Sequence, residues 1–159
     1  MAEPKKRNNP QPLVNKRARH NYEVLETLEA GIVLVGTEVK SLREGQADIA
    51  DAFAIPKGNE IYLLNLRIQP YRNATYFNHE EARSRKLLLK KEEITKLMSK
   101  VHEKRLTLVP LKLYFNARGK IKVELGLCRG KKNVDKREDE RKKQDQREMD
   151  RALKYRERS

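Results

Sequence analysis

The sequence predicts a mainly β domain with flanking helices, closed into a small barrel and followed by a charged tail. Residues 14–128 hold five to seven short β-type segments and one strongly periodic helix, enough for a single core of roughly 110 residues. A closed barrel suits this strand count because it leaves no long exposed edge. Residues 129–159 hold 13 Lys or Arg and 8 Asp or Glu but only five apolar side chains, so they cannot form a core.

The first 13 residues are polar and contain three prolines, and we expect them to be disordered. No hydrophobic run follows the basic start, so we do not expect a secretory signal. A basic segment, residues 15–20, then leads into the domain. Its polar and cationic side chains are spaced too closely for ordinary surface residues, and we expect them to contact phosphate. They are Asn15, Lys16, Arg17, Arg19 and His20.

Strand and turn signals alternate through the first half of the domain. Residues 22–28 indicate a strand, although Leu25 breaks the alternation, and Ala30-Gly31 is read as its end. Residues 32–35 are apolar and mostly β-branched, and they predict a second, buried strand. Thr37 to Gly45 predict a helix of one to two turns that stops at the glycine. Residues 52–64 predict a hairpin with its turn at 56–59.

Residues 70–85 have no period and predict a polar, basic loop. Its Tyr76 and Phe77 lie among cations, where they would either stack on unpaired bases or cap the barrel; both readings stay open. Arg83 and Arg85, at the end of the loop, are candidate phosphate contacts.

The second half of the domain carries the clearest helix. Leu87–Leu89 are expected in the core, and apolar residues at 94, 97, 98 and 101 follow helical spacing. Residues 106–115 and 121–125 flank a turn and predict a long hairpin. Pro110 cannot donate a ladder hydrogen bond, so it should mark a bulge, a bend or an edge. Lys90 and the other lysines around this helix most simply form a solvated face.

The residues present do not indicate an enzyme. The three histidines, His20, His79 and His102, stand apart from other ligand residues, and no phosphate-binding glycine loop occurs. Cys128 is expected to be a buried or inert thiol, and a single cysteine suits a reducing cytoplasm. No metal, cofactor or catalytic residue is predicted, and no stretch has the ~20 apolar residues of a membrane span.

The charge distribution points to nucleic acid. The net charge is +14, and both ends of the chain are more basic than the body. The tail lacks Pro, and no Gly follows Gly130, so it should be disordered when free and become helical on a polyanion. Glu29 and Glu38 would repel phosphate, so each is either an ion-pair or capping residue or an acceptor for base amino groups.

Five blocks of the sequence resemble the SsrA-binding protein family, also called small protein B. They occur in the family's order and run from residue 15 to 137: Asn15–His20, Glu29–Gly31, Gly36–Arg43, Arg85–Leu89, and Gly130–Lys132 with Asp135–Arg137. The family often has His or Asn at Lys90 and His or Tyr at Val134.

The resemblance implies an OB-like barrel and a non-enzymatic, cytoplasmic role in ribosome rescue. The family binds the tRNA-like domain of transfer-messenger RNA (tmRNA), supports its aminoacylation and delivers it to stalled ribosomes, and we expect a monomer. RNA contacts are expected from the segment at 15–20 and from Glu29, Gly31, Glu38, Lys40, Arg83, Arg85, Leu88 and Lys90.

The tail is expected to work inside the ribosome, in the decoding site and the empty mRNA path. Its residues for this role are Gly130, Lys131, Lys132, Asp135, Lys136, Arg137, Met149 and Leu153. The alternative is a structural ribosomal protein with an OB-like barrel and a basic extension, since the composition alone fits both.

Overall fold

The computed structural model describes residues 9–74, 76–131 and 133–158, which contain nine strands and four helices. Residues 1–8, most of the terminus for which we predicted disorder, lie outside this set. The helices are α1 (Lys16–Asn21), α2 (Gly36–Arg43), α3 (Lys91–Lys104) and α4 (Asn133–Arg158). The strands are β1 (Leu13–Val14), β2 (Tyr22–Ile32), β3 (Ala47–Asp48), β4 (Phe53–Lys57), β5 (Glu60–Leu64), β6 (Arg67–Ile68), β7 (Arg85–Leu88), β8 (Thr107–Phe115) and β9 (Ile121–Gly130).

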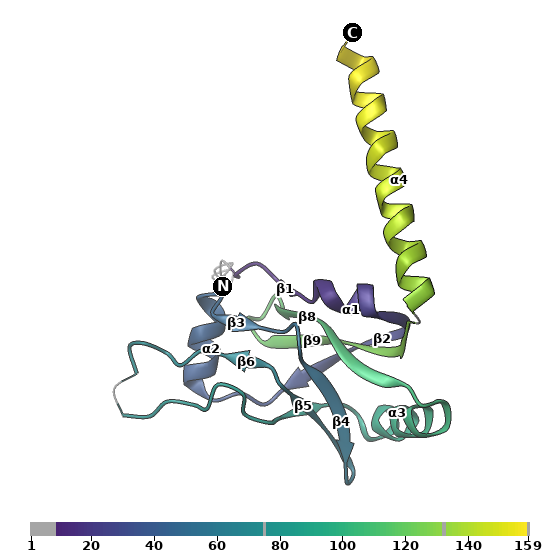
Figure 1. The fold of residues 1–159 in the computed structure, drawn as a ribbon. Coiled ribbons are helices and arrows are strands. Elements are labelled where there is room, and N and C mark those ends of the chain that lie inside the picture. Colours follow the sequence, from purple (N-terminus) through teal and green to yellow (C-terminus); the bar gives the residue numbers. More distant parts are fainter. Residues whose placement is uncertain (1–8, 75, 132, 159) are drawn as a thin grey trace, which may run out of the picture.

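Seven of the strands form one antiparallel sheet whose hydrogen bonds run in a ring. Its order is β1-β8-β4-β5-β7-β2-β9, and β8 also pairs with β9, which closes a ring of the six strands from β8 to β9; the short β1 is paired with β8 at the side of this ring. β3 and β6 form a separate two-stranded sheet. Figure 1 shows the strands gathered into one body, with α4 projecting away from it. The predicted strand-rich class with flanking helices is confirmed.

The core lies inside this ring. Ile61, Leu63, Leu87, Leu108 and Leu125 are at most 1% exposed, and they come from four different strands, β5, β7, β8 and β9. A smaller cluster lies outside the ring under α1 and consists of Ala18, Val109, Leu111 and Cys128. Cys128 is therefore buried, as predicted.

The path of β2 differs from the prediction. It runs without interruption through Ala30-Gly31 and ends at Ile32, so residues 33–35 do not form the expected second strand. Glycine at position 31 does not end the strand; a Cβ there would lie 3.1 Å from the Cβ of Leu88. The glycine thus permits β7 to pack closely against β2. Leu25 breaks the alternation because the pairing with β9 shifts between Val24 and Glu26.

Most other local predictions are confirmed. α2 ends before Gly45, whose φ of +73° requires glycine, and β4 and β5 form the expected hairpin. α3 spans the periodic segment, and Pro110 lies at a register shift between β8 and β9, so the bulge reading holds. Of the leucine triplet, Leu87 is buried but Leu88 is 52% exposed, because successive residues of a strand face opposite sides.

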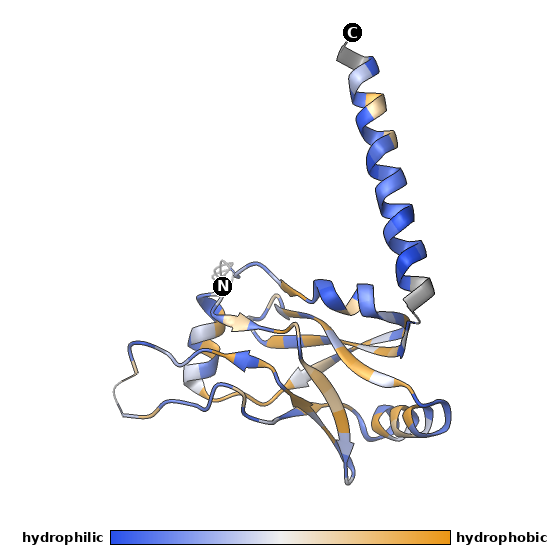
Figure 2. Ribbon diagram, viewed as in Figure 1, coloured by the Kyte–Doolittle hydropathy of each residue, from blue (hydrophilic) through white to orange (hydrophobic). Residues whose placement is uncertain are grey.

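At the start of the domain the structure differs from the prediction, and in the tail it contains the helix that we predicted for the bound state. Leu13, assigned to the disordered start, pairs with Leu113 as part of β1. The basic segment that follows is a helix, α1, which its lack of apolar periodicity concealed. The tail, which we expected to be disordered when free, is the helix α4, the form predicted for its bound state. Figure 2 shows that α4 is hydrophilic along almost its whole length.

Candidate nucleic-acid interface

Asn15 fixes the cationic helix α1 to the body. It is the N-cap residue, and its Oδ1 accepts a hydrogen bond from the Ala18 N–H at 3.1 Å. Its Nδ2 donates to the Pro110 carbonyl at 2.9 Å and to the Ile49 carbonyl at 3.3 Å. Asn15, which we predicted to contact RNA, is only 2% exposed. Its side chain holds α1 in position instead.

The cations of α1 face solvent. Ala18 supplies the buried side of the helix, whereas Lys16, Arg17 and Arg19 are exposed and His20 is half-buried. Arg17 makes a loose ion pair of 3.6 Å with Asp51, and both side chains are mostly in solvent. Such a pair contributes little to stability, so Arg17 can be recruited by a phosphate.

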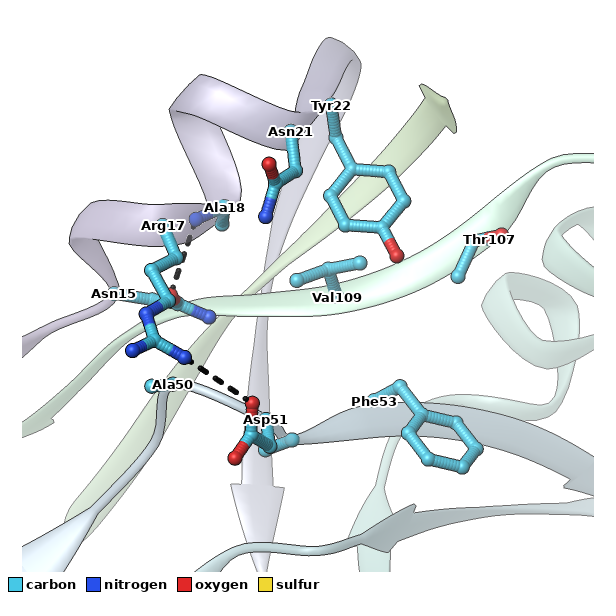
Figure 3. A pocket seen from close by; sticks show the side chains of 11 residues that line it. Asn15, Arg17, Ala18, Asn21, Tyr22, Ala50, Asp51, Phe53, Thr107 and Val109 are labelled. Atoms are coloured by element: carbon cyan, nitrogen blue, oxygen red, sulfur yellow. Dashed lines mark hydrogen bonds and ion pairs between the residues drawn. The ribbon is translucent and has the colours of Figure 1, made fainter. Parts of the chain in front are cut away.

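Beside α1 lies an open pocket of about 420 Å³. Figure 3 shows the rings of Tyr22 and Phe53 on different sides of it, with Val109 between them and Asn21 nearby. Aromatic side chains of this kind can stack on a planar base, and an amide can bond its edge. Sequence reasoning treated Tyr22 and Phe53 as ordinary strand residues, because only the fold brings them together.

A second exposed region lies on the outer face of β7, β2, β9 and β8. Gly31 of β2 is paired with Leu88 on one side and with Lys122 on the other, and Lys122 is paired with Tyr114. These four residues thus form one row across four strands. A pocket of about 320 Å³ opens at the row and is lined in part by Gly31, Leu88 and Lys122.

Glu29 is exposed in the neighbouring row of this face and accepts a hydrogen bond from the Tyr114 hydroxyl. This hydrogen bond is the main cause that raises the pKa of Tyr114 to about 12, so the phenol stays protonated. The Lys112 Nζ lies 5.2 Å from the centre of the Tyr114 ring. Glu29 is therefore neither a capping residue nor a simple ion pair; it orients an aromatic hydroxyl among cations.

Glu38 and Arg85, both predicted as RNA contacts, are 0% exposed and belong to the interior. The Glu38 carboxylate accepts hydrogen bonds from the Arg85 Nε, from the Arg83 Nη2 at 2.5 Å and from the Val35 N–H at 2.9 Å. Burial alone would raise the pKa of Glu38, but these hydrogen bonds outweigh it and lower the pKa. The structure therefore shows Glu38 as an ion-pair and helix-capping residue, the first of its two predicted roles.

The remaining predicted contacts are spread over the surface. The Lys40 Nζ lies 5.5 Å from the centre of the Tyr71 ring, and Lys90 is exposed just before α3. Arg83 keeps one third of its side chain in solvent while its Nη2 donates to the Val33 carbonyl at 3.3 Å. Tyr76 and Phe77 are 101% and 67% exposed, so they do not cap the core.

The tail residues fall into two groups. Gly130, Lys136 and Arg137 are exposed or half-buried near the start of α4, whereas Lys132 and the side chain of Asp135 lie outside the described residues. Met149 and Leu153 are 63% and 61% exposed near the far end.

Within the described ranges, no cluster of His, Cys, Asp and Glu has the arrangement of a metal site. A search of the same ranges finds no helix with the length and apolar character of a bilayer span.

Comparisons with known proteins agree on one family. A family model described as SmpB protein matches residues 13–155. An SsrA-binding protein of Desulforamulus reducens is 56% identical over 142 residues, which are 89% of this chain and 88% of the relative. The SsrA-binding protein of Symbiobacterium thermophilum is also 56% identical over 142 residues, 89% of this chain and 90% of the relative.

A solved structure described as "tmRNA-SmpB: a journey to the center of the bacterial ribosome" is similar as well. It is 58% identical in sequence, has a TM-score of 0.65, and the match covers 77% of this chain and 85% of that chain.

Proposed function

The chain belongs to the SmpB family, and from this premise we propose that the face around Glu29 and Tyr114 binds the tRNA-like domain of tmRNA. The protein is a tmRNA-binding factor of trans-translation that acts on the ribosome, and it is not an enzyme. One surface of the domain would bind tmRNA, and the tail would act in the ribosome. It also includes support of tmRNA aminoacylation and delivery of tmRNA to stalled ribosomes.

We assign the two tasks to two parts of the chain. Residues 14–128 form the RNA-binding domain, and the ring of hydrogen-bonded strands supports its description as an OB-like closed barrel. Residues 129–159 form the ribosome-directed tail, and residues 1–13 precede the domain. The protein would act as a monomer, with one barrel for each tRNA-like domain.

The observation that carries the RNA-binding proposal is the hydrogen bond from Tyr114 to Glu29 on an exposed, cation-bearing face. Lys112 of β8, two residues before Tyr114, and Lys122 of β9, paired with Tyr114, supply charge for phosphates. The oriented hydroxyl and the exposed Leu88 supply contacts that depend on RNA shape and on the 2′-hydroxyls. A carboxylate is useful here because it holds the tyrosine in one direction, which a cation cannot do.

Replacing Glu29 by Lys should therefore weaken tmRNA binding, although the added charge alone would strengthen it. Tyr114→Phe should lower the affinity about 2- to 10-fold, the effect of losing a hydrogen bond worth ~0.5–1.5 kcal/mol, and Glu29→Gln, whose amide oxygen is a weaker acceptor, should have a smaller effect. Titrations at several salt concentrations check this. The variant Tyr114→Phe should keep the salt slope of the parent, whereas the control Lys122→Gln should reduce that slope by about one.

Unchanged or tighter binding by Glu29→Lys would show that Glu29 and Tyr114 lie away from the RNA. A flat response of the parent protein to salt would contradict the phosphate contacts.

For the tail we propose entry into the decoding site and the empty mRNA path. A helix of 26 residues is about 39 Å long, enough to extend through such a site. Its basic and acidic side chains suit a path lined with RNA. The exposed Met149 and Leu153, four residues apart, form a narrow apolar stripe that a docked helix would use.

In the free protein we expect the far part of α4 to fray, and to become fully helical only on the ribosome. The stripe around Leu153 is exposed, and charged helices have little stability without tertiary packing. Amide hydrogen exchange should be slowest near Asp139 and approach the unfolded rate beyond residue 145. Uniform protection along α4 would contradict this expectation.

A further inference from the structure

The junction between the domain and the tail is attached to α1. β9 ends at Gly130 and α4 begins at Asn133, so only two residues separate the sheet from this helix. The Lys131 N–H donates to the Asn21 carbonyl at 3.0 Å, at the end of α1. The backbone is thus held by α1 just before α4 begins.

The side chain of Lys131 points inward, which is unusual for lysine. It is 17% exposed, and its Nζ donates to the Arg19 carbonyl at 3.1 Å and to the Asp139 carboxylate. The last carbonyls of a helix lack intrahelical partners and attract a cation. Asp139 lies in the second turn of α4. One ammonium group therefore joins the end of α1 to the tail helix.

A second contact lies beside the first. The His20 Nε2 is 3.3 Å from the Glu140 Oε1, and His20 belongs to the last turn of α1. Consecutive helix residues are about 100° apart around the axis, so Asp139 and Glu140 point in different directions. Two contacts in different directions restrict both the swing and the rotation of α4. Beyond them the helix projects from the body, as Figure 1 shows.

We infer that Lys131 is a positioning residue that sets the direction in which α4 leaves the domain, by joining Arg19 of α1 to Asp139 of α4. This differs from the ribosome contact that the sequence assigned to it, because its charge is directed into the protein. Its hydrogen bond is the largest cause that lowers the pKa of Asp139, so that carboxylate stays ionised in the pair at neutral pH.

Direction matters because the tail is long. For a helix of about 39 Å, a swing of about 20° at its base moves its far end by roughly 13 Å. Met149 and Leu153, nearer the base, would move by roughly 8 to 10 Å, enough to carry them away from a site that they are meant to enter. The inference thus deepens the proposed function of the tail and rests on it, but only for the tagging measurement below.

A distance measurement tests the positioning without RNA. Nitroxide labels at Ser99→Cys on α3 and Arg141→Cys on α4 would report the angle between the body and the tail, since both positions are exposed. Cys128 is 0% exposed and burial raises its pKa to about 11, so the reagent would react with the introduced thiols.

In double electron–electron resonance spectroscopy, the parent should give a narrow distribution of distances between the two labels. Lys131→Met and Asp139→Asn should broaden it, whereas Lys131→Arg, which keeps a cation, should largely preserve it. The matched control is Glu138→Gln, one residue before Asp139 and exposed, which should leave it narrow. A broad distribution in the parent, or equal widths in all variants, would overturn the inference.

Binding of tmRNA and peptide tagging on stalled ribosomes are measured on the same variants without labels. Lys131→Met should bind tmRNA within about twofold of the parent, while peptide tagging should fall roughly fivefold because the far end of α4 is no longer held in one direction. Normal tagging together with broadened distances would refute the claim that the direction of α4 matters for tagging. Failure of the parent to bind tmRNA would instead refute the proposed function, and the distance measurement would still judge Lys131.

Discussion

Deletion of residues 131–159 is expected to abolish peptide tagging on stalled ribosomes while tmRNA binding persists. β9 is complete at Gly130, and among the residues that the structure describes, the core inside the ring of strands contains none from the tail. The shortened protein should therefore fold with nearly the same melting temperature. Its affinity for tmRNA should fall at most a few-fold, since the tail contributes only general attraction to phosphates.

The measurement pairs RNA affinity with tagging on the same preparations. Leu153→Pro should reproduce much of the deletion because proline disrupts a helix interior, whereas Leu153→Ala should be milder. Replacing Asp135, Lys136 and Arg137 together by Ala should lose tagging with RNA binding largely intact. If the deleted protein still tags normally, or no longer binds tmRNA, the division between barrel and tail is wrong.

Local patterns predicted those elements whose signals lie within a few residues. The helical spacing of the apolar residues 94, 97, 98 and 101 predicted α3. The turn at Gly58, where φ is +62°, predicted the hairpin of β4 and β5. α1 was missed because only Ala18 faces the body, so no period exists. Its one local signal was Asn15 as a capping residue, three positions before Ala18.

Gly31 shows why some errors could not be avoided. A glycine in a β-type segment marks either a turn or a close approach of another backbone, and the two look alike in sequence. The neighbour that decides the matter, Leu88, comes from a distant part of the chain. Only the register of β2 with β7 distinguishes the two cases.

In the candidate site, too, only contacts between residues close in sequence could be predicted. The cations of α1 are adjacent in sequence and were predicted together. Tyr114, by contrast, is 85 positions from Glu29, and Arg85 is 47 positions from Glu38. Composition alone could not tell that one carboxylate lies on the surface and orients a phenol, whereas the other is buried between two arginines.

That buried carboxylate gives the largest effect expected on stability. Glu38→Gln should lower the free energy of unfolding by about 3–5 kcal/mol, because it leaves the charge of the fully buried Arg85 without its partner. This is a large share of the ~5–15 kcal/mol typical of a domain. Chemical denaturation monitored by circular dichroism would measure it. Since the single variant risks not folding, Glu38→Leu combined with Arg85→Met serves as the control and should be more stable than Glu38→Gln.

The same pair predicts how stability depends on pH. The pKa of Glu38 is lowered in the folded protein, so its contribution is fully present above the ordinary carboxyl value of 4.5. It is lost as the pH falls through the folded value, when the carboxylate takes up a proton and Arg85 loses its partner. The double variant should therefore lose less stability on acidification than the parent does. Equal acid sensitivity in both, or a cost below about 1 kcal/mol for Glu38→Gln, would mean that other contacts hold α2 against β7.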